Sequence, residues 1–179
     1  VDLVTPTHFL PAVLEALGEE PWPVPVVWNC GGYEKPEALR LLDGKVHIYL
    51  PDLKYALPGP AARFSGAEDY FDRAAPAIWE MFRQTGPYRL EDGQLQSGVL
   101  IRHLLLPGEL ENTRRVLDWV ARTFRPGDVL FSLMSQYTPQ PGAAGNLRRH
   151  VTKAEYRAAM AYMENCGITN GYTQERTSA

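Results

Sequence analysis

Short runs of aliphatic and β-branched residues alternate along the chain with stretches whose apolar residues recur at helical spacing. The runs rich in β-formers, each predicting a strand, are residues 1–4, 24–28, 46–50, 99–106 and 129–134. The stretches with helical spacing, each predicting a helix, are residues 9–17, 35–42, 67–83, 109–124 and about 152–165. Strands that alternate with helices form a parallel sheet with right-handed crossovers. The sequence therefore predicts an α/β fold, either most of a β/α barrel or a flavodoxin-like open sheet.

Three further segments are predicted from local signals. Residues 86–97 are polar and contain glycine, which indicates an exposed loop. Thr152, with Glu155 three residues later, fits a capping box at the start of the last helix. Residues 167–172 can add an edge strand to the sheet.

The composition indicates a globular protein and excludes several classes. Of 179 residues, 45% are hydrophobic, which is enough for a sizeable core. The net charge of −3, with both signs interspersed, argues against a nucleic-acid partner and against an anionic membrane surface. No apolar run approaches the roughly 20 residues that span a bilayer, and no secretory signal opens the chain, so we expect a cytoplasmic protein. Cys30 and Cys166 are the only cysteines, and neither a disulfide framework nor a cysteine-rich metal site is indicated.

Polar side chains follow each predicted strand. They are Thr5, Thr7 and His8; Asn29 with Gly31 and Gly32; Asp52 and Lys54; Arg102 and His103; and Gln136 with Tyr137. The carboxyl ends of parallel strands meet at one edge of a sheet or barrel, where ligands bind. Such a set suits a zwitterionic ligand, with Lys54 or Arg102 for a carboxylate and Asp52 for an ammonium group or a cation.

Structural roles are expected for His103, His47 and Cys30, whereas for His8, at a strand tip, a structural and a functional role both stay open. His103 directly follows Arg102, and neighbours in a strand point to opposite faces. If Arg102 faces the ligand, His103 faces the helix layer, where a hydrogen-bonded structural histidine is expected. His47 begins its strand at the opposite end from the predicted site, and Cys30 is expected to be a small buried packing residue. No residue is assigned a catalytic role.

The strand ends together resemble those of radical S-adenosylmethionine proteins, in particular the branch related to pyruvate formate-lyase-activating enzyme. The similar segments run in order through Val-Thr-Pro-Thr-His (4–8), Asn-Cys-Gly-Gly-Tyr-Glu (29–34), Tyr-Leu-Pro-Asp-Leu-Lys-Tyr (49–55), Ile-Arg-His-Leu-Leu-Leu-Pro-Gly (101–108) and Ser-Leu-Met-Ser-Gln-Tyr (132–137). The resemblance covers almost the whole chain. It implies a partial (β/α)6 barrel over residues 1–139, comprising the family's strands 2–6, followed by a linker and a helix and edge extension over residues 140–179 that packs on the barrel.

In that family a [4Fe-4S] cluster binds S-adenosylmethionine and cleaves it reductively to a 5'-deoxyadenosyl radical, which abstracts hydrogen. The resemblance implies that Thr5, Pro6 and Thr7 lie at the methionine amino group, and Asn29 and Asp52 near the methionine carboxylate or a monovalent cation. It implies that Lys54 and Arg102 hold a carboxylate or the substrate backbone. Gln136 and Tyr137 are implied to lie by the adenosine. A glycyl-radical protein as substrate, and flavodoxin or ferredoxin as electron donor, are the partners that it suggests.

The chain departs from the family pattern in three places. The usual Gly-Gly-Glu is absent at the first strand end, and Asn29 stands where activating enzymes often carry an aspartate. The Cys-x-x-x-Cys-x-x-Cys motif that ligates the cluster is also absent. Val1 opens the chain inside an apolar run, so we expect a C-terminal piece whose cluster cysteines lie upstream, without metal ligands of its own. Two alternatives stay open: a β/α-barrel lyase with Lys54 as Schiff-base amine, and a non-catalytic binding domain that uses loop 86–97.

Overall fold

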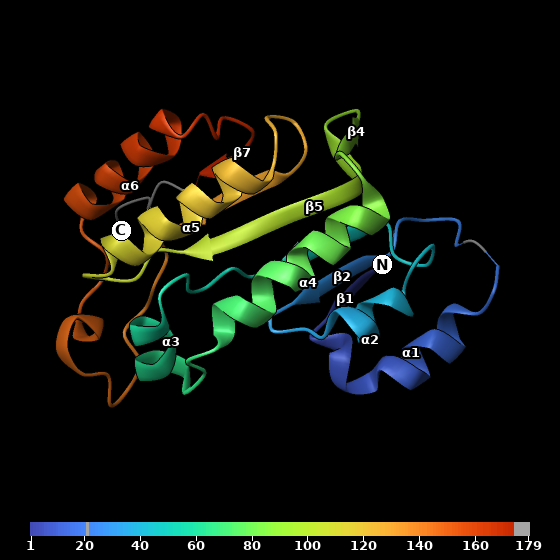
Figure 1. Cartoon of the computed structure of the whole chain (residues 1–179), viewed down its shortest axis with the longest axis horizontal. Coiled ribbons are helices and arrows are strands. Elements are labelled where there is room, and N and C mark those ends of the chain that lie inside the picture. Colours follow the sequence, from blue (N-terminus) through green and yellow to red (C-terminus); the bar gives the residue numbers. More distant parts are fainter. Residues whose placement is uncertain (21, 174–179) are drawn as a thin grey trace.

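The computed structural model describes residues 1–20 and 22–173. Strands and helices alternate along the chain, and each predicted strand and helix is present (Figure 1). In chain order the elements are β1 (Asp2–Val4), the 3-10 helix η1 (Pro6–Phe9), α1 (Leu10–Leu17), β2 (Val27–Cys30), α2 (Pro36–Arg40), β3 (Ile48–Pro51), α3 (Pro58–Ser65), α4 (Tyr70–Thr85), β4 (Arg89–Glu91), β5 (Gln94–Leu104), α5 (Leu110–Thr123), β6 (Leu130–Met134), the 3-10 helix η2 (Gly145–Arg148), α6 (Lys153–Asn165) and β7 (Gly171–Thr173).

One parallel sheet, with strand order β1-β2-β3-β5-β6-β7, forms the centre of the molecule. The strands therefore lie in the sheet in the order in which they occur in the chain. A flavodoxin-like sheet reverses its winding at a switch point, and the strands of the described ranges show no reversal. The predicted α/β fold with a parallel sheet is confirmed, and the expected edge strand near the C-terminal end is β7.

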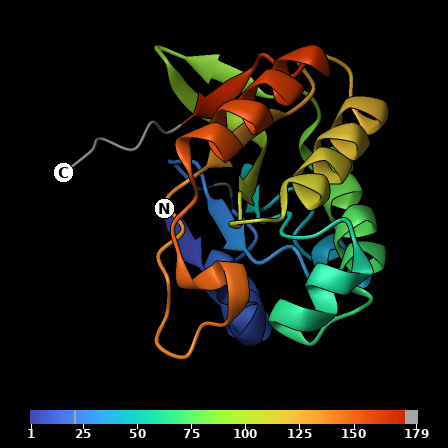
Figure 2. The same ribbon diagram turned by 90° about the vertical axis from the view of Figure 1, so that its left-hand side faces the viewer.

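Helices α4 and α5 lie side by side across the sheet in both views of the molecule (Figures 1 and 2). Their contact is aromatic: the ring centroids of Trp79 and Phe124 are 5.9 Å apart, and those of Phe71 and Trp119 are 5.8 Å apart. α6 packs on α5, where the Tyr162 hydroxyl donates to Asp118 at 2.8 Å. The largest fully buried side chains are Trp28, Tyr49, Phe131, Leu39, Leu42, Leu53, Ile78, Met81, Ile101, Leu105, Leu117 and Leu133.

The prediction of a loop over residues 86–97 is wrong, because β4 and the start of β5 form an antiparallel hairpin there. Asp92 and Gly93 connect the two strands with φ angles of 50° and 77°. Positive φ at both central residues is the conformation of a type I′ turn, which Asp-Gly favours. The dipeptide was thus a usable hairpin signal, although the polar residues beside it obscured the strand alternation.

A second departure is α3, which the sequence did not predict. Pro58 and Pro60 lie in its first turn, where the missing backbone N–H groups have no helical acceptor to lose, and Gly66 ends the helix with φ +62°. Two prolines and a glycine within eight residues are typical of a loop, and they are compatible with a helix here only because they lie in its first turn.

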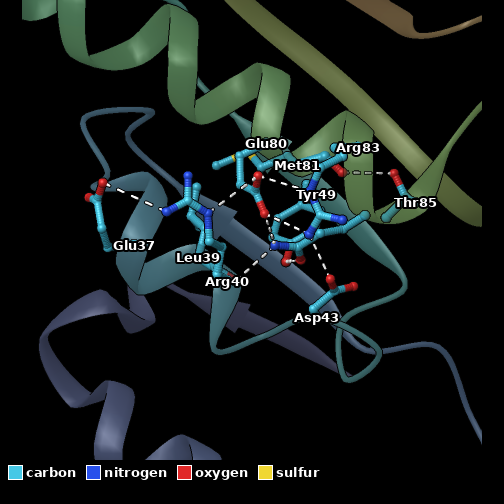
Figure 3. Close-up of polar contacts among 10 residues, drawn as sticks. Glu37, Leu39, Arg40, Asp43, Tyr49, Glu80, Met81, Arg83 and Thr85 are labelled. Carbon is cyan, nitrogen blue, oxygen red and sulfur yellow. Dashed lines mark hydrogen bonds and ion pairs between the residues drawn. The ribbon is translucent and has the colours of Figure 1, made fainter.

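Helix α4 is attached to α2 through the buried carboxylate of Glu80, which is 5% exposed (Figure 3). The carboxylate accepts hydrogen bonds from Nε and Nη2 of Arg83 at 3.0 and 2.9 Å and from Nε2 of Gln84 at 2.8 Å. Gln84 in turn donates to the Leu39 carbonyl at 2.9 Å and accepts from the Tyr49 hydroxyl at 2.5 Å. Because every buried polar atom of this network has a partner, the carboxylate stabilises the contact of α2, α4 and β3.

The predicted capping box at α6 is present. Thr152 Oγ1 accepts from the Glu155 backbone N–H at 3.1 Å, and the Glu155 carboxylate accepts from the Thr152 backbone N–H at 2.9 Å. The same carboxylate accepts two hydrogen bonds from Arg149 and one from the Gly108 N–H. These donors, Arg149 first, hold the pKa of the Glu155 carboxyl well below its usual range. The cap therefore also joins α6 to the loop that follows β5.

Candidate functional site

Four polar side chains converge at the carboxyl ends of β2, β3 and β5. Arg102 Nη2 lies 2.7 Å from Asp52 Oδ1 and donates to Asn29 Oδ1 at 2.8 Å. Lys54 Nζ lies 3.8 Å from the second carboxylate oxygen of Asp52. We call Asn29, Asp52, Lys54 and Arg102 the strand-tip cluster. All four were expected to lie at one site, and the structure brings them together.

The register of the parallel strands produces this convergence. Asn29 is paired with Leu50 across β2 and β3, and Asp52 forms an isolated parallel bridge with Arg102 of β5. Backbone bonds fix Asp52 on both sides: its N–H donates to the Cys30 carbonyl of β2 at 3.0 Å, and the Leu53 N–H donates to the Arg102 carbonyl of β5 at 2.8 Å. The charged side chains are therefore carried by rigid strand ends.

His103, the neighbour of Arg102 in β5, points to the other face and is buried against α5. Its Nδ1 lies 2.7 Å from the Leu53 carbonyl oxygen and its Nε2 lies 2.9 Å from Thr113 Oγ1. A carbonyl can only accept, so Nδ1 carries the proton and Nε2 accepts from the threonine hydroxyl. The prediction of a structural histidine in the helix layer is confirmed.

The charges of the strand-tip cluster do not balance. Lys54 and Arg102 supply two cations against the single carboxylate of Asp52, so one positive charge is in excess. About a quarter of the Asp52 and Arg102 side chains is exposed, and nearly half of Lys54. Arg102 Nε is buried and has no acceptor within the residues that the structure describes. A site with an excess cation and an unused donor is suited to an anionic group such as a carboxylate.

The loop between Asn29 and α2 forms one wall of the site. Gly32 has φ +80°, and a Cβ there would lie 2.0 Å from the Asp52 carbonyl oxygen, so only glycine fits. Tyr70 at the start of α4 fixes this approach. Its hydroxyl lies 2.9 and 2.6 Å from the Gly31 and Asp52 carbonyl oxygens and accepts from the Lys54 N–H at 3.1 Å. Sequence reasoning counted Tyr70 only as an apolar residue of the helix, and no sequence signal reveals its hydroxyl contacts.

The segment from Thr5 to Thr7 lies beside β2. The Thr5 N–H donates to the Asn29 carbonyl at 2.8 Å, and Thr5 adopts φ 53° as the chain turns into η1. Pro6 is buried, and Thr7 Oγ1 donates to Glu34 Oε2 at 2.8 Å. Glu34 is buried on the loop before α2 and was not among the predicted site residues. The three residues thus lie next to the strand-tip cluster, and the Thr7 side chain has Glu34 as its polar partner.

Gln136 and Tyr137, which follow β6, make different contacts. The Gln136 side chain is exposed. The Tyr137 hydroxyl donates to the Leu147 carbonyl at 3.0 Å, and His150 Nδ1 lies 2.9 Å from the Tyr137 carbonyl oxygen. Tyr137 is therefore tied to the η2 segment, and no polar contact between these two side chains and the strand-tip cluster occurs in the described ranges.

The two cysteines have buried or partly buried thiols. Burial, followed by the nearby carboxylate of Glu34, raises the pKa of Cys30, and burial also raises the pKa of Cys166. Cys30 packs within the buried hydrophobic core, as expected for a small packing residue. Over residues 1–20 and 22–173, no group of three or more histidine, cysteine or acidic side chains is placed to hold a metal ion, and no helix is long and apolar enough to cross a membrane.

Comparison with known proteins agrees with this architecture. No protein-family model matches the chain. The chain is 28% identical over 166 residues to the uncharacterized protein MJ0674 of Methanocaldococcus jannaschii, a match that covers 91% of the chain and 45% of that relative. A solved domain of pyruvate-formate lyase-activating enzyme from Bacteroides vulgatus superposes with a TM-score of 0.69 at 10% identity, covering 98% of each chain. The chain thus spans less than half the length of this curated relative and shares its α/β fold with a domain of an activating enzyme.

Proposed function

We propose that the strand-tip cluster binds the amino-acid end of S-adenosylmethionine, in a partial (β/α)6 barrel of the radical S-adenosylmethionine type. The observation that carries the proposal is the Asp52–Arg102 ion pair with Asn29 and Lys54 at the carboxyl ends of three parallel strands. Parallel α/β folds bind small ligands at that edge. The fold shared with a domain of pyruvate-formate lyase-activating enzyme supports the same assignment.

The residues of the site have distinct roles under this proposal. Lys54 and Arg102 attract the ligand carboxylate, and Asp52 holds the two cations in place. Gly32 lets the loop pack directly against the Asp52 carbonyl, which holds the Gly31–Gly32 turn beside the strand-tip cluster. The side of the site next to β1 is bounded by Thr5, Pro6 and Thr7.

A [4Fe-4S] cluster does not fit the residues described. Radical S-adenosylmethionine chemistry needs three cysteine ligands, whereas the sequence has two cysteines, and Cys30 is buried beside a carboxylate. We therefore assign no radical step to these residues. Hydrogen abstraction, a glycyl-radical protein as substrate, and flavodoxin or ferredoxin as electron donor are proposals for a longer protein that supplies the cluster.

The alternatives from the sequence are less well supported. A Schiff-base lysine is activated in a desolvated pocket or beside another cation, whereas Lys54 is nearly half exposed and beside a carboxylate. A non-catalytic binding domain would use the β4–β5 hairpin, whose Leu90 is 44% exposed, and would leave the strand-tip cluster without a ligand.

The proposal is tested by nuclear magnetic resonance on the 179-residue chain. Millimolar S-adenosylmethionine should shift the Arg102 Nε–H and Asn29 side-chain amide resonances, and Arg102→Met should weaken binding at least tenfold. Arg115→Met is the matched control, because within residues 1–20 and 22–173 that arginine pairs with Glu111 alone, on the surface of α5. Absence of any shift, or equal affinity of the Arg102 variant, would contradict the proposal; shifts confined to the hairpin would favour the binding domain.

A further inference from the structure

Glu34 is a buried carboxylate for which the described part of the chain provides no cation. It is 7% exposed and lies on the loop between β2 and α2. Its hydrogen-bond donor is the neutral hydroxyl of Thr7, at 2.8 Å. No lysine, arginine or histidine nitrogen of residues 1–20 or 22–173 lies within 4.0 Å of it. Buried carboxylates are nearly always paired, because an isolated buried charge is costly.

The other acidic groups of the interior and of the site show the usual arrangement. Glu80, 5% exposed, accepts two hydrogen bonds from Arg83 and one from Gln84. Asp52 has Arg102 on one oxygen and Lys54 near the other. Glu34 therefore differs from both, since its negative charge is left to be matched by something outside the described chain.

Glu34 lies close to the strand-tip cluster, on the side of β1. Thr7, which donates to it, is two residues after Thr5, whose N–H bonds the Asn29 carbonyl. Burial is the main cause that raises the pKa of the Cys30 thiol, and the charges of Glu34, Asp52 and Arg102 also act on it, so all three groups lie in the neighbourhood of Cys30. The excess positive charge at the tips of β3 and β5 and the unmatched negative charge of Glu34 thus lie in the same neighbourhood, around Cys30.

We propose that Glu34, assisted by Thr7, binds the primary ammonium group of an α-amino acid moiety whose carboxylate lies on Lys54 and Arg102. A zwitterion placed in this way matches the charge on both sides of the site. Asp52 then has a structural part, holding two cations that would otherwise repel each other, and is not the ammonium ligand. The inference rests on the proposed function, because the α-amino acid moiety is taken to be the methionine end of S-adenosylmethionine.

Three thioether nucleosides test the inference: S-adenosylhomocysteine, its decarboxylated amine, and 5'-methylthioadenosine, which has neither charged group. Their affinities are measured by resonance shifts for the wild-type chain and for Glu34→Gln. We expect the substitution to weaken the binding of S-adenosylhomocysteine and of its decarboxylated amine by the same factor, about 10- to 150-fold for a lost charge-assisted hydrogen bond. The affinity for 5'-methylthioadenosine should not change. Glu37→Gln on the exposed face of α2 is the matched control and should change none of them.

The outcomes separate this inference from the proposed function. If the wild-type chain binds none of the three nucleosides, the proposed function is wrong, and the inference with it. If the wild-type chain binds S-adenosylhomocysteine and Glu34→Gln binds it with the same affinity, the inference is wrong while the proposed site stands. The same conclusion follows if Glu34→Gln loses as much affinity for 5'-methylthioadenosine as for S-adenosylhomocysteine. Thr7→Val provides a second variant should Glu34→Gln not fold. It should weaken the binding of S-adenosylhomocysteine and its decarboxylated amine several-fold without changing the affinity for 5'-methylthioadenosine.

Discussion

The buried histidine behind the strand-tip cluster makes folding stability depend on pH in a calculable way. Burial lowers the pKa of His103 from 6.5 to about 4, because no water solvates the charged ring there, and the hydrogen bond to the Leu53 carbonyl opposes this shift only in part. The unfolded chain therefore binds a proton at a higher pH than the folded chain. The contribution of the neutral His103 ring to the free energy of unfolding is fully present above pH 6.5 and is lost as the pH falls toward 4.

The two pKa values set the size of the effect. Between pH 7 and pH 5 the free energy of unfolding should fall by about 2 kcal/mol, and by about 3 kcal/mol once the pH is below 4. Glu80 and Glu155, whose pKa values are lowered by Arg83 and Arg149, also lose stabilising charge in acid. Their contribution begins only near pH 4.5, so the window from pH 7 to pH 5 belongs to His103.

Urea denaturation at pH 7 and pH 5 measures this difference directly. His103→Asn is the matched control, since an asparagine amide can still donate to the Leu53 carbonyl but does not titrate in this range. The variant is expected to be less stable than the wild-type chain at pH 7, yet to lose almost nothing between the two pH values. Equal losses for both proteins would refute the argument, because the proton uptake would then lie elsewhere.

Three substitutions test the remaining structural claims by thermal and urea unfolding. Glu80→Gln should cost about 2 kcal/mol, and Glu37→Gln on the exposed face of α2 less than about 0.5 kcal/mol; similar costs would show that the buried network is not stabilising. Gly32→Ala should cost more than about 2 kcal/mol, and Gly44→Ala, which has φ +76° but open space around it, about 1 kcal/mol. Thr152→Ala should cost about 1 kcal/mol through the lost cap, and an unchanged melting temperature would contradict the capping box.

The part of the site that the sequence predicts correctly is the part fixed by strand register. Asn29, Asp52 and Arg102 each stand at a strand end, and parallel pairing brings such positions to one edge. The opposite orientations of Arg102 and His103 follow from the same two-residue period. Periodic structure can be inferred from a pattern of residue types, and these positions belong to periodic structure.

The rest of the site depends on loops, where no period applies. Tyr137 lies only three residues beyond β6, yet the chain carries it to the η2 segment, where its hydroxyl bonds the Leu147 carbonyl. Glu34 and Thr7 are 27 residues apart and meet because Thr5 turns with a positive φ angle. A left-handed threonine has no strong sequence signature, so the partner of Thr7 could not be found without coordinates.

The distribution of charge at the strand ends determines how a dipolar ligand can lie. Arg102 is held by Asp52 and Asn29, so its position is set before any ligand arrives. Glu34 is held by Thr7, in the segment whose Thr5 N–H bonds the Asn29 carbonyl. Reversing the ligand would bring its carboxylate against the buried carboxylate of Glu34 and its ammonium against two cations, and both contacts are repulsive in a poorly solvated site. Under the proposed function, the charges that attract an amino acid group therefore admit it in a single orientation.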